Sequence, residues 1–367
     1  MDKAKLRARL LRYLEEQGFF SKEPFEDKDQ IRKLHRAAVL YQRERARKRL
    51  ARDEPKLLAY IAHGRELDVK KIRPVLIPVA RKSKEERLFR YARLHWSIPI
   101  SSGYGRRLRF LVWDDYHGKL MGLIGLSDPV YSLAPRDRWI GWNKEVKKRR
   151  IKNVMDAFVL GAVPPYSLVL GGKLVALGVW SREVSRAFSE RYAQRRSTIR
   201  GEPVGELALI TTTSALGRSS LYNRLKFHGK KIFQPVGFTQ GTGDLPFLNG
   251  FYDELFRLVR EYEKPTAKHP SWGKGYRNRR EVITKALKLL QLPLDLRRHG
   301  VKREVFVVPL GPLARDYLQG KTEEFRPENA SFEELAAYAL ERWVWPRAKH
   351  DERYRAFEPE QWRLWSG

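Results

Sequence analysis

A run of polar residues between a predicted strand and a predicted helix is the first place in this chain where we expect chemistry. Residues 211–224 read TTTSALGRSSLYNR and follow the apolar segment 207–210, which is typical of a buried strand. Ser219 or Ser220 is expected to cap the helix, and the free amides of its first turn would suit an anion such as phosphate. The alternative is a strand-to-helix turn whose hydroxyls only satisfy backbone groups. The candidate nucleic-acid-binding residues of this turn are Arg218, Ser219, Ser220, Asn223 and Arg224.

Three aspartates are candidate catalytic residues and metal ligands. Asp128 precedes a proline at a predicted strand end, Asp137 lies in a loop between two arginines, and Asp156 is expected on the helix before the third predicted strand. Hard cations prefer oxygen ligands, so these three together would hold one or two Mg²⁺ ions for phosphodiester chemistry. The alternative for each aspartate is a salt bridge to one of the many arginines.

Tyr222 is a fourth catalytic candidate. It follows Arg218 by about one helical turn and stands beside Asn223. A tyrosine hydroxyl in such a position could attack a DNA phosphate as a nucleophile. The alternative is a tyrosine packed under the helix, which would have no chemical role.

The glycine-containing segment 164–174 suggests a different chemistry. A strand, a loop with Gly171, Gly172 and Lys173, and a helix resemble the way GNAT-class acetyltransferases hold the pyrophosphate of coenzyme A on backbone amides. The usual loop there has Arg or Gln, two residues, Gly, one residue, then Gly or Ala. Leu168 stands at the first of these positions and Lys173 at the last. We therefore expect these three cofactor-binding candidates not to bind acetyl-CoA.

Several common reactive motifs are missing from the sequence. Gly172-Lys173 lacks the upstream glycine and the following Ser or Thr of a Walker loop, so the chain is not expected to be an ATPase by itself. The eight histidines show no ligand spacing, and a zinc site is not expected. The chain has no cysteine, which excludes disulfides and thiol catalysis.

The charge balance favours a polyanionic partner. The chain has 74 Lys and Arg against 43 Asp and Glu, a net charge of +31. Such an excess opposes compact folding by self-repulsion unless a polyanion offsets it, and nucleic acid, DNA above all, is the usual one. The aromatics Trp139, Trp142 and Trp272 are candidates for stacking on bases. The further basic candidates are Lys147, Lys148, Arg149, Arg150, Lys274, Arg277, Arg279 and Arg280.

The sequence also carries expectations about compartment. Its longest apolar stretches are far shorter than a bilayer span, and its second residue is already charged, unlike a secretory leader. We expect no membrane insertion. Together with the missing cysteines, these features predict a cytoplasmic protein.

Hydrophobic periodicity predicts an α+β fold. Segment 108–126 is expected to form a hairpin with Asp114 and Asp115 at its tip, and strands and helices alternate after it. Pro74 and Pro78 are expected to break a helical pattern. The predicted regions are a helical basic N-terminal region (1–85), a GNAT-like mixed sheet flanked by helices (86–265), a basic C-terminal extension (266–320) and a helical, aromatic-rich tail (321–367).

Several stretches taken together resemble one family. They read RYARLHWSIP at 90–99, GLIGLSDPV at 122–130, GGKL at 171–174, the polar run at 211–224, and PVGFT at 235–239. As a set they resemble the DruA family, which is named after the Druantia anti-phage systems and has related domains joined to transposases. The resemblance covers about 85–310 and implies a DNA-associated role in defence or in mobile elements. The positions that it marks as functional are Asp128, Asp137, Asp156, Arg218, Ser219, Tyr222 and Asn223.

Three functions remain open at this point. The first is DNA binding with DNA processing, by nicking or strand transfer, in a defence or mobile-element system. The second is a GNAT-type acyltransferase. The third is a DNA-binding adaptor without catalysis that recruits a helicase or nuclease, with the aromatic tail as its docking surface.

Overall fold

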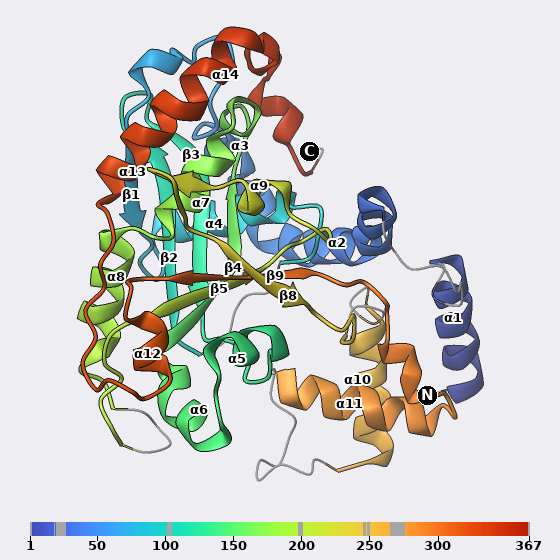
Figure 1. Cartoon of the computed structure of the whole chain (residues 1–367). Coiled ribbons are helices and arrows are strands. Elements are labelled where there is room, and N and C mark those ends of the chain that lie inside the picture. The colour runs from blue at the N-terminus through green and yellow to red at the C-terminus, as the bar shows by residue number, and fades with distance from the viewer. Residues whose placement is uncertain are drawn as a thin grey trace.

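A seven-stranded mixed sheet runs through the centre of the computed structural model, which describes residues 2–17, 19, 27–100, 105–196, 201–244, 247, 250–264 and 276–365 (Figure 1). All neighbouring strands are antiparallel except β4 and β5. The α+β class is confirmed, while the finer GNAT-like description stays a prediction. In spatial order the strands are β1 (Pro74–Pro78), β2 (Arg107–Asp114), β3 (Lys119–Ser127), β4 (Val154–Ala162), β5 (Leu209–Thr213), β9 (Glu304–Pro309) and β8 (Gln234–Phe238).

The predicted hairpin is present, and it gains a third strand. β2 and β3 pair around a tip at Asp114, whose buried carboxylate accepts hydrogen bonds from the Arg73 amide at 3.0 Å and the Tyr166 hydroxyl at 2.8 Å. The segment Pro74–Pro78 does not merely break a helix, as expected, but pairs with β2 as β1. Prolines fit there because an edge strand leaves one row of backbone amides without ladder partners.

The sequence interpretation placed Asp156 on a helix, and that placement is wrong. Helix α6 (Lys144–Arg150) ends before a short turn, and β4 begins at Val154. β4 lies between β3 and β5, with Asp156 opposite Ser127 on one side and Thr211 on the other. The basic residues 144–150 and the apolar residues that follow them do not form one continuous helix, because the first belong to α6 and the second to β4.

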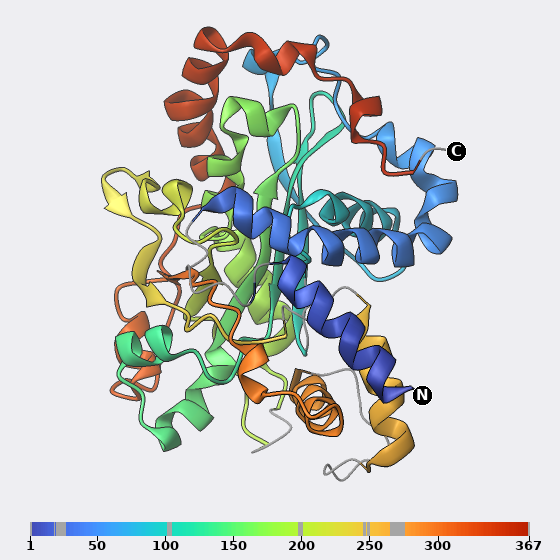
Figure 2. The same cartoon turned by 90° about the vertical axis from the view of Figure 1, so that its right-hand side faces the viewer.

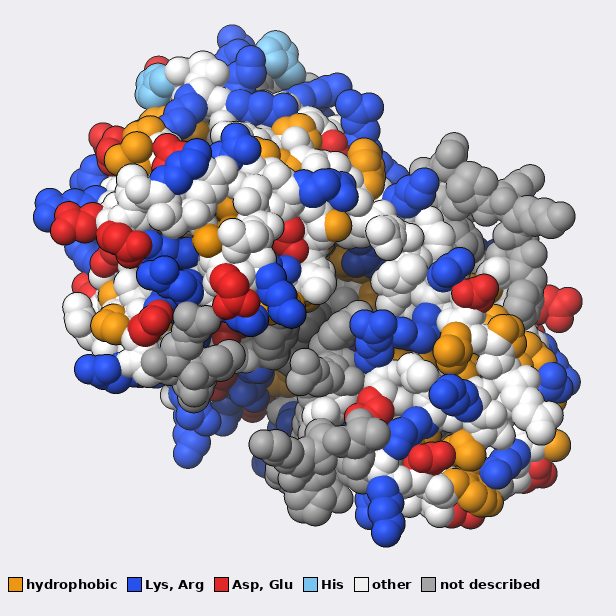
Figure 3. Space-filling model, turned by 60° about the horizontal axis from the view of Figure 1, so that its bottom comes forward, with side chains coloured by type: hydrophobic (Ala, Val, Ile, Leu, Met, Phe, Trp, Pro, Cys, Tyr) orange, Lys and Arg blue, Asp and Glu red, His pale blue; other side chains and the backbone are white. Residues whose placement is uncertain are grey.

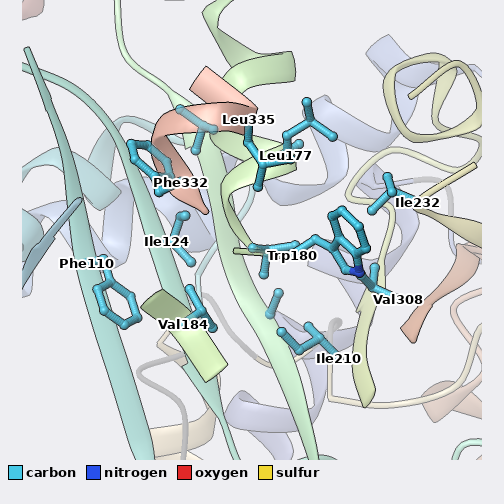
Figure 4. Close-up of a cluster of buried hydrophobic side chains, with 14 of the residues drawn as sticks. Phe110, Ile124, Leu177, Trp180, Val184, Ile210, Ile232, Val308, Phe332 and Leu335 are labelled. Carbon is cyan, nitrogen blue, oxygen red and sulfur yellow. The ribbon is translucent and has the colours of Figure 1, made fainter. Parts of the chain in front are cut away.

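One face of the sheet is covered by helices α7 (Gly171–Gly178), α8 (Arg182–Phe188) and α13 (Phe332–Ala339). Figure 4 shows side chains of this layer, in which Leu177, Phe332 and Leu335 from the helices belong to one buried cluster with Ile124 and Ile210 from the strands. Gly178 permits the close approach, because a Cβ at this position would lie 2.8 Å from the Phe332 ring. The tail helix is thus part of the main core.

The opposite face is covered by N-terminal helices and by the end of the chain. Helices α2 (Lys28–Leu50), α3 (Glu54–Leu58) and α4 (Lys84–Ala92) lie there, and Figure 2 shows α2 crossing in front of the sheet. Phe89 of α4, Leu123 of β3 and Trp365 near the C-terminus share this second core. Residues from both ends of the chain therefore build one layer.

Three helices form a smaller unit with a core of its own. Helices α1 (Lys3–Glu16), α10 (Phe251–Tyr262) and α11 (Tyr276–Leu289) bury Leu10, Leu255 and Ile283 against one another. These helices come from three of the predicted regions. The remaining elements are α5 (Ala134–Ile140), α9 (Ser220–Asn223), the hairpin strands β6 (Lys226–Phe227) and β7 (Lys230–Lys231), α12 (Ala314–Leu318) and α14 (Trp345–His350).

Within the described ranges, no helix combines the length and the apolar character that crossing a bilayer requires.

Candidate nucleic-acid interface

A cleft with a volume of about 910 Å³ lies between α2, α4, the parts of strands β2, β4 and β5 that line it, and the loops around α10 and β9. Among the residues that the structure describes, three carboxylates line it, those of Glu86, Asp244 and Asp253. Figure 3 shows a hollow across the molecule with lysine and arginine side chains on both sides of it. We call this the arginine cleft, after the eight arginines that line it, Arg45, Arg49, Arg90, Arg93, Arg107, Arg109, Arg279 and Arg303.

Regular secondary structure aims these arginines into the cleft. Arg45 and Arg49 are four residues apart on α2 and so share one face of the helix. Arg107 and Arg109 alternate along β2 and so point from the same face of the sheet. The Arg43 side chain, which donates a 3.0 Å hydrogen bond to the Leu94 carbonyl, holds α2 against the end of α4.

Glu86 is the internal counterion of the cleft wall. Its buried carboxylate accepts hydrogen bonds from Arg109 at 2.8 Å, Arg90 at 3.0 Å and the Lys82 amide at 2.8 Å. Burial alone would raise the pKa of Glu86, but these hydrogen bonds and the two arginine charges lower it below its usual value. One negative carboxylate therefore pairs with two positive guanidinium groups, and a net positive charge remains.

The excess positive charge is visible at Arg93. Burial, together with the charges of Arg90, Arg109 and Arg107, lowers the pKa of Arg93 to about 10. Neighbouring like charges raise the free energy of the folded chain, and Glu86 offsets only part of this cost, because the arginine charges still lower the pKa of Arg93. The cleft is therefore suited to a ligand with several negative charges.

The polar run 211–224 is arranged around an internal carboxylate. Ser219, one of the two serines predicted to cap this helix, caps α9 by accepting a hydrogen bond from the Tyr222 amide. The Ser219 amide and the Asn223 side chain both donate to Glu304, at 3.0 and 2.9 Å. An acidic side chain thus takes the place predicted for phosphate, which favours the alternative of a structural turn. Arg218, Ser220 and Arg224 are exposed, and Thr213 at the start of the run lines the cleft.

Two of the three candidate aspartates are engaged in salt bridges. Asp128 pairs with Arg106 at 2.6 Å, and Asp137 pairs with the buried Arg136 and with Lys147, each at 2.6 Å. Over the described part of the chain, no three His, Asp or Glu side chains lie close enough together to hold a metal ion. The salt-bridge alternative is favoured for both residues, and the magnesium site stays an untested prediction.

Asp156 differs from the other two aspartates. Its carboxylate accepts a hydrogen bond from Thr211 at 2.9 Å, and the residue keeps a small exposed surface. Burial of the carboxylate raises its pKa to about 6, although the Thr211 hydrogen bond and the charge of Arg136 act in the opposite direction. It stands opposite Ser127 in the sheet, and Ser127 in turn pairs with Arg107 of the cleft.

Comparisons with known proteins cover nearly the whole chain. The family model described as Druantia protein DruA matches residues 26–320. A curated relative, Druantia protein DruA from Escherichia coli (strain UMEA 4076-1), is 38% identical over 366 residues, which are 98% of this chain and 91% of the relative. The chain belongs to the DruA family. No solved structure matches it. The resemblance read from the motifs is therefore confirmed, and the DruA match includes all eight cleft arginines.

Tyr222 is packed as the structural alternative expected. Its ring stacks on Phe233 at a centroid distance of 4.6 Å and meets Phe306 edge-on at 5.3 Å. Burial raises the pKa of Tyr222 to about 12, so its hydroxyl keeps its proton at neutral pH. These contacts favour a role in packing over one as a nucleophile.

The basic candidates of α6 divide into buried and exposed residues. Lys147 and Arg150 are enclosed in ion pairs with Asp137 and Glu323, whereas Lys148 and Arg149 are more exposed. Trp142 donates a 2.6 Å hydrogen bond to the Leu318 carbonyl and lies over Arg136, and Trp139 lies over Arg315. Both tryptophans therefore already stack on the protein's own arginines.

The candidates of the basic extension are only partly described. Arg279 lines the cleft, 3.7 Å from Asp244, and Arg280 is exposed. Lys274, Trp272 and the side chain of Arg277 lie outside the described residues. For the extension, the structure thus supports Arg279 as a cleft residue.

The glycine loop at the start of α7 is closely packed. A Cβ on Gly171 would lie 2.6 Å from the Tyr166 carbonyl oxygen, and one on Gly172 would lie 3.3 Å from Leu221. Lys173 lies over the Trp343 ring at 4.8 Å. Close packing explains why glycines stand here, and the prediction about acetyl-CoA remains untested.

Sequence reasoning missed the arginines at the heart of the cleft as site residues. Arg107 and Arg109 alternate with apolar residues in the strand sequence RLRFLVW, which places both on one face of a buried strand. That pattern was a usable signal, because cations on a largely buried sheet face need an anionic partner, as Arg109 has in Glu86. Arg303 offered no comparable signal, since only the folded chain brings it to α2.

Proposed function

We propose that this chain binds nucleic acid, DNA in the first place, as part of an anti-phage defence system, with a sugar–phosphate chain seated in the arginine cleft. The observation that carries the proposal is that, among the described residues, eight arginines converge on one cleft with three carboxylates; they come from α2, α4 and the turn after it, β2, α11 and the residue before β9. A phosphate chain supplies several negative charges and matches the guanidinium group with paired oxygens.

Two further parts of the proposal rest on other observations. The name of the curated relative, Druantia protein DruA, supports a place in a defence system and partner proteins from the same system. Processing of the bound strand, by nicking or strand transfer, is assigned first to Asp156. It is the one of the three predicted aspartates for which no salt bridge is seen among the described residues.

Neutralising two exposed cleft arginines tests the binding mode. In the double variant R45Q/R49Q, DNA affinity should fall and become less dependent on salt. Each lost phosphate contact removes roughly 0.9 from the slope of log affinity against log salt on duplex DNA, so the slope should shrink by roughly 2. Fluorescence anisotropy with a labelled oligonucleotide at several salt concentrations measures both quantities.

The same helix supplies the matched control. Arg47 and Lys48 are exposed residues of the last turn of α2 that do not line the cleft. The variant R47Q/K48Q removes the same charge from the same end of α2 and should keep most of the wild-type affinity and slope. An equal loss in the two double variants would show that total charge, and not the cleft, governs binding.

A further inference from the structure

The inner end of the cleft holds an unusual contact between an arginine and a histidine. Arg303 Nη2 lies 3.0 Å from Nε2 of His35, a residue of α2 that is 1% exposed. An arginine can only donate, so His35 Nε2 is the acceptor. Burial, with the charges of Arg303 and His299, lowers the pKa of His35 to about 3. The imidazole is therefore neutral at neutral pH, and its one proton is on Nδ1.

This arrangement leaves two N–H donors unused. His35 Nδ1 and Arg303 Nε are both buried, and neither has a hydrogen-bond partner among the described residues. Buried donors without partners are rare, because each one forfeits its hydrogen bonds to water. Both residues line the cleft, as do Thr239 and Thr242. The Thr239 hydroxyl accepts a 3.1 Å hydrogen bond from the Arg303 amide and so ties the arginine to the loop after β8.

The neighbouring histidine, His299, is also neutral but is the other tautomer, with its proton on Nε2. Nδ1 of His299 accepts a 3.2 Å hydrogen bond from the Val301 amide, and burial lowers the pKa of His299 to about 4. His299 also lines the cleft and, being neutral, adds no charge. The positive charge beside His35 comes from Arg303, while Arg279, which also lines the cleft, is paired with Asp244.

We propose that His35 and Arg303 form a subsite that binds one phosphoryl group through the His35 Nδ1 proton and the Arg303 Nε proton. The proposal rests on the proposed function and adds to it a fixed position for one phosphate. The groups available are donors, so they suit an anion, and the positive charge of Arg303 opposes a metal ion. Phosphate is the anion that an arginine-lined cleft for nucleic acid would receive, as a phosphodiester of the chain or as a terminal phosphate.

The test follows the His35 Nδ1 proton in the full-length chain by NMR after labelling the imidazole nitrogens. The probes are inorganic phosphate, with chloride at equal ionic strength as the reference, and oligonucleotides with and without a 5′-phosphate. We expect a shift of the His35 signal with phosphate and with at least one oligonucleotide. A shift with both oligonucleotides identifies a phosphodiester, and a shift with only the phosphorylated one identifies a terminal phosphate.

Two substitutions separate charge from hydrogen bonding. R303K keeps the charge and lacks the Nε proton, and R303M lacks both; we expect oligonucleotide affinity to fall about tenfold or more in R303M and by an intermediate factor in R303K. A His35 signal that stays unchanged with every probe would overturn the subsite. The broader proposal would survive that result if R45Q/R49Q still weakened DNA binding, so the two failures are distinguishable.

Discussion

A chain that ends at residue 320 is expected to lose the native fold. The removed tail carries α13, whose Phe332 and Leu335 are buried in the main core, and Phe357 and Trp365, which are buried in the second core. Losing both sets leaves cavities on the two faces of the sheet. Removing a single large apolar side chain from a core costs about 3–5 kcal/mol. The summed cost of losing these four side chains therefore exceeds the free energy of unfolding of an ordinary domain.

A buried carboxylate fastens the end of the chain to α3. Glu54 is 1% exposed and accepts hydrogen bonds from the Leu364 amide at 2.6 Å, the Trp365 amide at 3.2 Å and the Tyr91 hydroxyl at 2.8 Å. Trp362 stacks on His95 with ring centroids 3.6 Å apart. These contacts engage two of the tail aromatics, Trp362 and Trp365, within the protein itself, and docking through the rest of the tail stays a prediction.

Point variants keep this prediction measurable when the truncated chain does not express. Trp365→Ala should lower the free energy of unfolding by about 3–5 kcal/mol in chemical denaturation. Glu360→Gln, which breaks an exposed ion pair with Arg363, should change it by less than about 1 kcal/mol. A chain of residues 1–320 that melts cooperatively near the wild-type temperature would contradict the assignment of the tail to the core.

The sequence predicted the elements of this protein better than their assembly. The β2–β3 hairpin and a serine cap on α9 were predicted because each is encoded within about twenty consecutive residues. β1 was missed because its two prolines are read locally as breaks, and only pairing with β2 makes them part of a strand. The tail aromatics look like an exposed surface until α3 and α4 are placed beneath them.

For the candidate site too, local sequence indicated single residues but not which of them come together in space. Arg45 and Arg279 are far apart in the chain, and nothing local shows that they share a cleft with Arg109. The polar run at 211–224 was chosen for its chemistry, but its anion is Glu304, a residue of β9 that no local pattern connects to it. Residue type and spacing therefore predicted a basic protein with a polyanionic partner, while the position of the candidate cleft required the fold.

Replacing Asp156 by asparagine is expected to stabilise the protein at neutral pH. Burial raises the pKa of this carboxyl from 3.8 to about 6. A raised folded-state pKa means that the folded chain binds the proton more tightly than the unfolded chain, so stability falls as pH rises from about 4 to about 6. Above that range the ionised carboxylate costs at most about 3 kcal/mol, at about 1.4 kcal/mol per pKa unit.

The substituted asparagine side chain would keep an oxygen that accepts the Thr211 hydrogen bond and would carry no charge. Asp156→Asn should therefore melt at a higher temperature than the wild type at pH 7–8. The difference between the two melting temperatures should become smaller as pH falls below about 6. Asp128→Asn, which breaks the ion pair with Arg106, is the control and should not stabilise. A less stable Asp156→Asn at pH 7 would contradict the raised pKa.

A charge that destabilises the fold at the centre of a sheet is a reason to look for function there, since sites of chemistry often trade stability for reactivity. Asp156 stands in the sheet row that leads through Ser127 to Arg107 of the cleft. If the bound strand is nicked, the asparagine variant should bind DNA with wild-type affinity and lose nicking. Nicking that persists in this variant would remove Asp156 from the reaction and assign the reaction to another residue.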